Sequence, residues 1–229
     1  MNGREQRLLA LLALQGIRVR RYIAGTLWPD STENHALASL RATICRVRHA
    51  RPGLLIADGM AVGLDTRLRV DVDDVTMYAT HAIEEPETVD VSAATYRLGR
   101  GDLLPGWYDD WVLSERERLQ EIRIRALESL TEHSLRRGDT GSAMAAAVAA
   151  IAVDPLRESA HRALITVHLA AGNNADAVQE FRRYRRTLRH EFGLAPSQHM
   201  VELMRPLFDH RDDASAPINP ARVFPARTG

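Results

Sequence analysis

Arginine and histidine side chains gather on one side of a predicted helix over residues 33–49. Of all the segments in the chain, this one has the side chains best suited to binding a ligand. Residues spaced three or four apart form this polar side: His35, Ala38, Ala42, Arg46 and His49. An apolar stripe forms the opposite side: Leu37, Leu40, Ile44 and Val47. A helix of this kind can lie in the major groove of DNA, where cations bind phosphates and polar groups reach base edges.

The candidate DNA-contacting residues lie on this helix and on the segments around it. Arginines at the start of a preceding helix suit phosphates, and a small Ala42 would let the helix seat or contact a thymine methyl group. The full set is Arg20, Arg21, His35, Ser39, Arg41, Ala42, Arg46 and Arg67. Arg48 lies nearer the apolar stripe, so for this residue a structural role is the alternative to DNA contact. The alternative for the whole set is an ordinary solvent-exposed helix face that carries a few arginines and contacts no DNA.

Three helices and a hairpin must position these residues. Helices are predicted over residues 5–14, 20–27 and 33–49, and Ser31 or Thr32 can cap the third. Two short apolar segments, 54–57 and 60–64, flank Asp58-Gly59, which is a hairpin signal. The order helix, helix, helix, hairpin is typical of a winged helix-turn-helix. The hairpin tip, Asp58-Gly59-Met60, carries no positive charge, although Arg67 and Arg69 lie near its base.

The second half of the chain repeats with a period of 34 residues, as tetratricopeptide helical hairpins do. A shift of 34 pairs Leu130 with Leu164, Gly138 with Gly172, Ala143 with Ala177, Ala147 with Phe181 and Ala150 with Tyr184. The predicted helices are 72–83, 91–98, 111–137, 142–152, 155–171, 175–191 and 197–208. Pro155 is expected to open its helix. From Asp209 onward the polar, proline-containing composition predicts disorder.

The charge distribution separates the chain into parts. Residues 1–70 carry 11 arginines and 5 acids, residues 71–110 carry 2 and 10, and residues 111–229 carry 17 and 15. The basic first part is the candidate for a polyanionic partner. Cys45 is the single cysteine, which excludes a disulfide framework and agrees with a reducing cytoplasm. No apolar run is long enough for a membrane span.

Other patterns that resemble chemical sites have simpler interpretations. The run Phe181–Arg186 resembles a nucleic-acid patch, but its aromatic residues fall at core positions of the repeat. His161 and His168 share a helix face without further metal ligands, so neither a metal nor another cofactor is expected. Glutamates and arginines alternating over residues 115–125 indicate ion pairs on a helix surface. No catalytic motif is present, so an enzyme is not expected.

Three segments resemble the bacterial transcriptional activator domain: residues 103–121, 154–162 (Asp-Pro-Leu-Arg-Glu-Ser-Ala-His-Arg) and 188–197 (Leu-Arg-His-Glu-Phe-Gly-Leu-Ala-Pro-Ser). This domain is typical of the Streptomyces antibiotic regulatory protein family, where it follows an OmpR-type winged helix. Residues 25–29 and 38–41 resemble the second and third helices of that winged helix. The resemblance implies a mainly α protein with a winged helix-turn-helix followed by a tetratricopeptide-like repeat domain.

The resemblance also implies a function and a division into domains. The winged helix would bind direct repeats in promoter DNA, and the activator domain would support a homodimer and contact RNA polymerase. The expected domains are residues 1–69, residues 70–208 and a disordered tail, 209–229. Only four residues precede Glu5, so either the native start lies upstream or the usual N-terminal sheet is lost. Without that sheet, one face of the helical bundle is expected to be exposed. The alternative function is an adaptor that binds a protein or peptide and no DNA.

Overall fold

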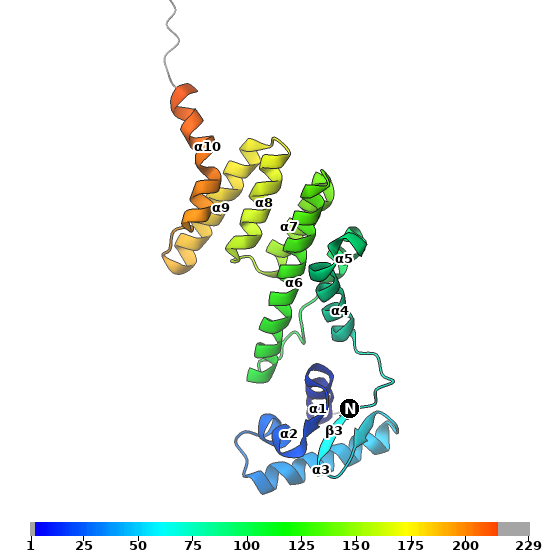
Figure 1. Ribbon diagram of the computed structural model, residues 1–229. Coiled ribbons are helices and arrows are strands. Elements are labelled where there is room, and N and C mark those ends of the chain that lie inside the picture. Colours follow the sequence, from blue (N-terminus) through cyan, green and yellow to red (C-terminus); the bar gives the residue numbers. More distant parts are fainter. Residues whose placement is uncertain (1–2, 215–229) are drawn as a thin grey trace, which may run out of the picture. The chain divides into compact units, whose positions relative to one another are not determined.

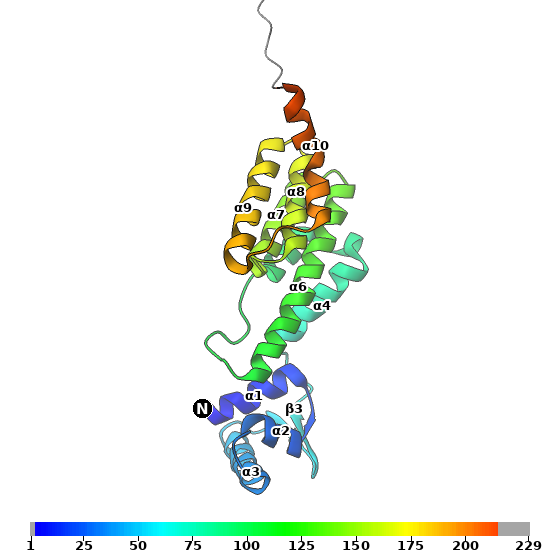
Figure 2. The ribbon, with the colours of Figure 1, turned by 90° about the vertical axis from the view of Figure 1, so that its left-hand side faces the viewer.

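The computed structural model describes the backbone of residues 3–214 and the side chains of residues 3–208 (Figures 1 and 2). The chain divides into two compact units, Met1–Leu127 and Glu128–Gly229, which we describe separately. The fold is mainly α, as predicted, and it contains one small sheet. The domain division at residues 69 and 70 stays a prediction.

The first elements of unit 1 form the predicted winged helix-turn-helix. They are α1 (Gly3–Gln15), β1 (Arg18–Val19), α2 (Arg20–Leu27), α3 (Glu33–Ala50), β2 (Leu55–Ala57) and β3 (Ala61–Leu64). The strands pair antiparallel in the order β1-β3-β2. Strand β1 was not predicted, because a strand of two residues shows no alternation of polar and apolar side chains. It extends the predicted hairpin to a three-stranded sheet.

Apolar residues from α1, α2 and α3 form the core of this region. Leu8, Leu11 and Leu40 are fully buried, and Ala36 and Thr43 join the predicted apolar stripe of α3 while Leu37 stays partly exposed. Because all these side chains recur at helical spacing, each helix presents one continuous apolar face to the others.

Residues from α6 cover the part of α1 that carries Leu8 and Leu11, so this part of the bundle is not exposed as predicted. Trp111 and Val112, from the start of α6 (Asp110–Arg136), belong to the same buried core as Leu8 and Leu11 of α1. Trp107 packs against this core and meets Trp111 edge to face, with ring centroids 6.4 Å apart. Residues some hundred positions away therefore complete the bundle.

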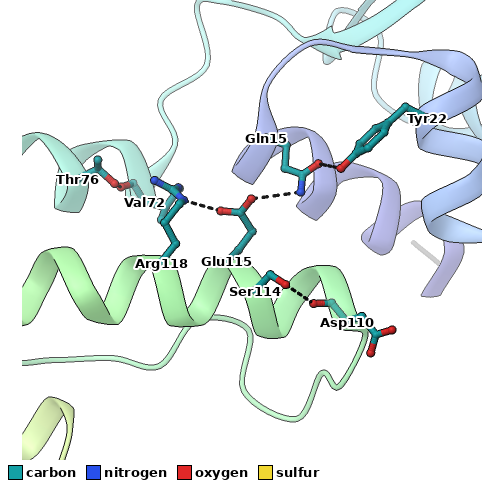
Figure 3. Close-up of polar contacts among 8 residues, drawn as sticks. All are labelled: Gln15, Tyr22, Val72, Thr76, Asp110, Ser114, Glu115 and Arg118. Carbon is teal, nitrogen blue, oxygen red and sulfur yellow. Dashed lines mark hydrogen bonds and ion pairs between the residues drawn. The ribbon is translucent and has the colours of Figure 1, made fainter. Parts of the chain in front are cut away.

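Polar contacts accompany this packing of α6 on α1. Figure 3 shows Gln15 between two partners: its amide nitrogen donates to Glu115 of α6 at 3.2 Å, and its oxygen accepts from the Tyr22 hydroxyl at 2.9 Å. Glu115 also pairs with Arg118 at 2.8 Å, and Arg7 pairs with Asp109. These contacts fix which face of α6 lies against α1.

Two further helices of unit 1 form an acidic hairpin. They are α4 (Asp71–Glu84) and α5 (Val91–Leu98), with the short 3-10 helix η1 (Pro86–Thr88) between them. Three aspartates occupy the first turn of α4, where they favour the positive end of the helix dipole. The Asp90 side chain caps α5 by accepting from the backbone N–H of Ala93.

Arg116 and Arg123 of α6 hold the loop that follows α5. The Arg116 guanidinium donates to the carbonyl oxygens of Leu103, Leu104 and Trp107. Arg123, which is 5% exposed, donates to the carbonyls of Leu98, Arg100 and Gly101. The prediction that the charges over 115–125 form surface ion pairs is therefore right for Glu115 and Arg118 and wrong for Arg116 and Arg123.

Replacing Arg123 with methionine is expected to destabilise unit 1 by about 3 kcal/mol, because three loop carbonyls would lose a charged donor. Urea unfolding followed by tryptophan fluorescence measures this loss. Arg125→Met is the matched control, since Arg125 is exposed two residues away on the same helix. Equal midpoints for the two variants would contradict the role given to Arg123.

Unit 2 contains the predicted helical repeats. After the end of α6 it consists of α7 (Thr140–Val153), α8 (Glu158–Ala170), α9 (Asn174–Phe192) and α10 (Gln198–Ala214). Figures 1 and 2 both show α7, α8 and α9 side by side. The tail was predicted from residue 209, but α10 continues to Ala214, and the remaining residues, 215–229, lie outside the described part.

The 34-residue period reappears as equivalent geometry. Gly138 and Gly172, one period apart, both have a φ of 74°, a conformation that favours glycine at the end of a helix. The residues at the equivalent positions of the two repeats are all buried. They are Ala143, Ala147 and Ala150 in the first repeat, and Ala177, Phe181 and Tyr184 in the second. The tetratricopeptide-like interpretation is confirmed.

Pro155 does not open α8, which begins at Glu158. The Asp154 side chain accepts from the backbone N–H of Leu156, and the Arg157 N–H donates to the Asp154 carbonyl. These bonds form a turn before the helix. Proline suits this turn because its φ is fixed and no backbone N–H is needed at its position.

A buried polar cluster joins α8 to α9. His161 Nδ1 lies 2.6 Å from Glu180 Oε1, Nε2 lies 2.9 Å from the Pro155 carbonyl oxygen, and the ring stacks on Tyr184. Arg183 adds an ion pair to Glu180 at 2.6 Å. Burial raises the pKa of the Glu180 carboxyl, but the hydrogen bonds and charges of His161 and Arg183 outweigh it, so the pKa lies below its ordinary value.

Glu180→Gln is expected to destabilise unit 2 by about 2 kcal/mol at neutral pH, because a buried charged hydrogen bond is lost. A lowered carboxyl pKa stabilises the fold fully above the ordinary value of 4.5, and this contribution disappears as the pH falls through the folded-state value. Urea unfolding followed by circular dichroism should therefore show a difference from wild type that shrinks in acid. The exposed Glu191→Gln is the control, and a difference that stays constant with pH would contradict the pKa direction.

Candidate nucleic-acid interface

The outward face of α3 carries most of the predicted contact residues. His35, Arg41 and Ala42 are exposed, and Ser39 is half-buried. Cys45 and His49 lie on the same face and are exposed as well. The Arg41 side chain makes no hydrogen bond or ion pair within the described residues, so its guanidinium is available to a ligand. Small side chains, Ala38 and Ala42, therefore lie at the centre of this face, and polar side chains lie around them.

A groove of about 490 Å³ lies between α2, α3 and the hairpin. Three arginines line it. Arg20 lies at the start of α2, and Arg41 and Arg48 lie on one side of α3, about two helical turns apart. Its remaining lining is uncharged: Leu37, Leu40, Ile44, Cys45 and Gly59. With three guanidinium groups and no carboxylate among its described lining residues, the groove suits an anion such as a phosphate group.

Arg20 of α2 contacts the tip of the hairpin. Arg20 donates to the Asp58 carbonyl oxygen at 3.1 Å, and its backbone N–H donates to the Met60 carbonyl at 2.9 Å. The Asp58 side chain accepts from the N–H groups of Ala61 and Met60, which form the turn and lower the pKa of its carboxyl. The tip has no basic residue of its own, but the Arg20 guanidinium lies against it, close enough to act on the Asp58 carboxylate.

Three predicted contact residues are already paired within the protein. Arg21 pairs with Glu33 at 2.9 Å, and both side chains are largely exposed. Arg67 makes two hydrogen bonds to Asp65 and holds the pKa of that carboxyl at about 2. Arg46 pairs with Glu5 of α1 at 3.2 Å, and the Glu5 side chain is only 9% exposed. The Arg46 guanidinium therefore binds a buried carboxylate as well as facing outward, and its role in DNA contact stays a prediction.

Two further arginines of the winged helix, Arg48 and Arg18, lie outside the set predicted from the sequence. Arg48 is exposed and donates to the Ala57 carbonyl of β2 at 3.3 Å, so it links α3 to the hairpin while lining the groove. Arg18 of β1 lies over the Tyr22 ring at 6.0 Å. The position of Arg48 on the helical wheel between the apolar and polar sides could have indicated this role, whereas β1 gave no signal.

The other patterns are structural where the structure describes them. Phe181 and Tyr184 are buried, and Arg185 lies over the Phe181 ring, so the basic run of α9 has no aromatic residue free for stacking on bases. Within the described residues no three His, Cys, Asp or Glu side chains are grouped to hold a metal ion. None of the helices in that part of the chain is both long and apolar enough to cross a membrane.

Comparison with known protein families gives a match over most of the chain after the winged helix. Residues 73–207 match the family described as bacterial transcriptional activator domain. This range begins within α4 and ends within α10, so it includes all the helical repeats.

Curated relatives are similar over nearly the whole chain. Regulatory protein AfsR of Streptomyces coelicolor is 28% identical over 227 residues, covering 93% of this chain and 22% of its own length. Regulatory protein DnrI of Streptomyces peucetius is 26% identical over 243 residues, covering 94% of this chain and 88% of its own. The chain thus spans about a fifth of AfsR and most of DnrI.

A solved structure has the same fold. The chain of Mycobacterium tuberculosis EmbR, in complex with a low-affinity phosphopeptide, superposes with a TM-score of 0.72 at 19% sequence identity. The similarity covers 92% of this chain and 60% of that one. It includes both the winged helix and the helical repeats.

Proposed function

Because the chain belongs to the bacterial transcriptional activator domain family and is a regulator of the Streptomyces antibiotic regulatory protein type, we propose that it binds double-stranded promoter DNA through α3 and the hairpin. In this proposal α3 lies in the major groove, and the chain acts by binding rather than by catalysis. The winged helix binds direct repeats, and the helical repeats contact the transcription machinery.

The observation that carries DNA binding is the groove of three arginines beside the exposed face of α3. We infer that Arg20, Arg41 and Arg48, which line this groove, hold phosphates, and His35 and Ser39 lie on α3 toward its N-terminal end. In helix-turn-helix proteins this end of the recognition helix contacts base edges. The cation that Arg20 brings to the hairpin tip supports a backbone contact there.

A binding titration against DNA from the region upstream of its own coding sequence tests this function. Fluorescence anisotropy should show saturable binding that weakens steeply with salt, since each phosphate contact releases counterions. Sequence-scrambled DNA of the same length is the control. Absence of salt-dependent binding by the intact chain would favour the alternative, an adaptor that binds proteins only.

We also propose that unit 2 supplies the surface for RNA polymerase and for a second copy of the chain. Large apolar side chains are exposed where α9 passes into α10: Phe192, Leu194 and Val201. Exposed apolar groups that lie together are typical of protein-binding surfaces. Sedimentation equilibrium of wild type and a Phe192→Ser, Leu194→Ser variant tests self-association, and a pull-down with purified RNA polymerase tests the other contact.

A further inference from the structure

A second groove, of about 920 Å³, lies in unit 2 between α9 and the middle of α10. Its lining from α9 begins at Asn174, the first residue of that helix, and extends to Arg186. Since an α-helix rises by about 1.5 Å per residue, the groove follows α9 over about 18 Å. It is therefore long enough for about three turns of another helix.

Arg182 and Arg186 give this groove two positive charges without a counter-ion. They lie four positions apart on α9, so they share one side of the helix and are about one turn from each other. Both side chains are exposed, and neither guanidinium makes a hydrogen bond or an ion pair within the described residues. No aspartate or glutamate is among the described residues that line the groove. The groove therefore attracts an anionic ligand.

The arginines between them on α9 have other partners. Arg183 is paired with Glu180 at 2.6 Å, and Arg185 lies over the Phe181 ring with its guanidinium carbon 5.7 Å from the centroid. These two cations already have contacts within unit 2, whereas the two groove arginines have theirs still to make.

Apolar side chains lie beside the groove arginines. Val178 from α9, and Pro206 and Leu207 from α10, line the same groove. Val178 and Leu207 are half-buried, because they also pack against the apolar core between α9 and α10. A nucleic-acid backbone would leave this apolar wall in water, whereas an acidic peptide with apolar residues of its own would bury it. The lining therefore favours a protein ligand over a nucleic acid.

The spacing of the two arginines matches an amphipathic helix. Carboxylates four positions apart on a helix are separated by about one turn, roughly 6 Å along the axis, as Arg182 and Arg186 are. Apolar residues three or four positions apart form a neighbouring stripe on such a helix. Helices that bind in grooves use this combination of an apolar stripe and flanking charges.

We propose that the groove between α9 and α10 is a docking site for an acidic amphipathic helix of a partner protein, with carboxylates on Arg182 and Arg186 and apolar side chains on Val178 and Leu207. The site consists of other residues than the exposed apolar surface proposed above for unit 2. It depends neither on DNA binding nor on a contact with RNA polymerase.

A designed peptide of about 20 residues tests the site in the full chain, because shorter helices are marginal in water. Leucines three and four positions apart give it an apolar face, and glutamates four positions apart flank that face. Fluorescence anisotropy of the labelled peptide should show saturable binding that weakens with salt. Two control peptides, one with lysine in place of glutamate and one with the leucines scrambled off the face, should each bind at least about tenfold more weakly.

Variants of the protein locate the binding. Arg182→Gln and Arg186→Gln should each weaken binding of the glutamate peptide by about threefold and together by about tenfold, since each removes one exposed ion pair. Arg189→Gln is the matched control, because Arg189 is an exposed arginine of α9 that does not line the groove, and it should leave the affinity unchanged. Arg182→Glu together with Arg186→Glu should reverse the preference, so that the lysine peptide binds more tightly than the glutamate peptide.

Several results would overturn this proposal. Absence of saturable binding is one, and equal affinities of the wild type and the double glutamine variant are another. Equal binding of the scrambled peptide would mean that charge alone attracts it and that the apolar wall is not used. If the double glutamine variant lost affinity for duplex DNA as steeply as for the peptide, the groove would be a phosphate-binding surface instead.

Discussion

Replacing Arg41 and Arg48 together with alanine is expected to weaken binding to the promoter DNA by about a hundredfold at moderate salt. Both guanidinium groups line the groove between α2, α3 and the hairpin, and no carboxylate of its lining competes for them. Removing two phosphate contacts should also lower the slope of log K against log salt by about 2. Anisotropy titrations at several salt concentrations measure both quantities.

The matched control is Arg189→Ala, which removes an exposed arginine from α9 in unit 2. It should leave both the affinity and the salt slope unchanged. Arg41→Ala alone is the cleaner of the two single variants, because Arg48 also donates to the Ala57 carbonyl and its loss could disturb the hairpin. If the double variant bound DNA as the wild type does, α3 would not be the DNA-binding element.

Paired arginines should behave differently from the groove arginines. Arg67→Ala is expected to change DNA affinity by less than about threefold, since Asp65 already neutralises its charge through two hydrogen bonds. Arg46→Ala should mainly reduce stability, because it leaves the buried Glu5 carboxylate without this partner. The sequence alone does not distinguish these arginines, whereas the structure separates them by the groups that they already bind.

Local pattern was sufficient for most helices of this protein. The apolar spacing in residues 33–49 and the paired glycines Gly138 and Gly172 depend only on neighbours in sequence, so they predict elements and turns correctly. The two-residue strand β1 is set by pairing with β3, about forty residues later. No local pattern encodes a partner at that distance, which is why β1 was missed.

The roles of individual charges were harder to predict for the same reason. Arg46 meets Glu5, and Arg123 meets carbonyls more than twenty positions before it. Alternating signs over 115–125 looked like pairs along one helix, yet Arg116 and Arg123 face a loop rather than their helical neighbours. The arginine groove itself joins α2, α3 and the hairpin, so only the folded chain brings Arg20 beside Arg41 and Arg48.

Trp111→Ala is expected to destabilise unit 1 by about 4 kcal/mol, since a large buried side chain would leave a cavity in the core shared with Leu8 and Leu11. The same variant should weaken DNA binding, although Trp111 is far in sequence from α3, because the α1 bundle that supports α3 loses its cover. Urea unfolding measures the stability. All three tryptophans, Trp28, Trp107 and Trp111, lie in unit 1, so their fluorescence follows that unit.

Trp111→Phe provides the control that separates volume from hydrogen bonding. The indole nitrogen of Trp111 is buried and has no acceptor within the described residues, so phenylalanine removes an unsatisfied donor while keeping an aromatic ring. It should cost less than half as much as alanine. A loss below about 1 kcal/mol for Trp111→Ala would mean that α1 does not depend on α6 for its core. The expected large loss would instead make residues 104–118 a working part of the winged helix, so a fragment ending at residue 69 should bind DNA poorly even with the whole of α3 present.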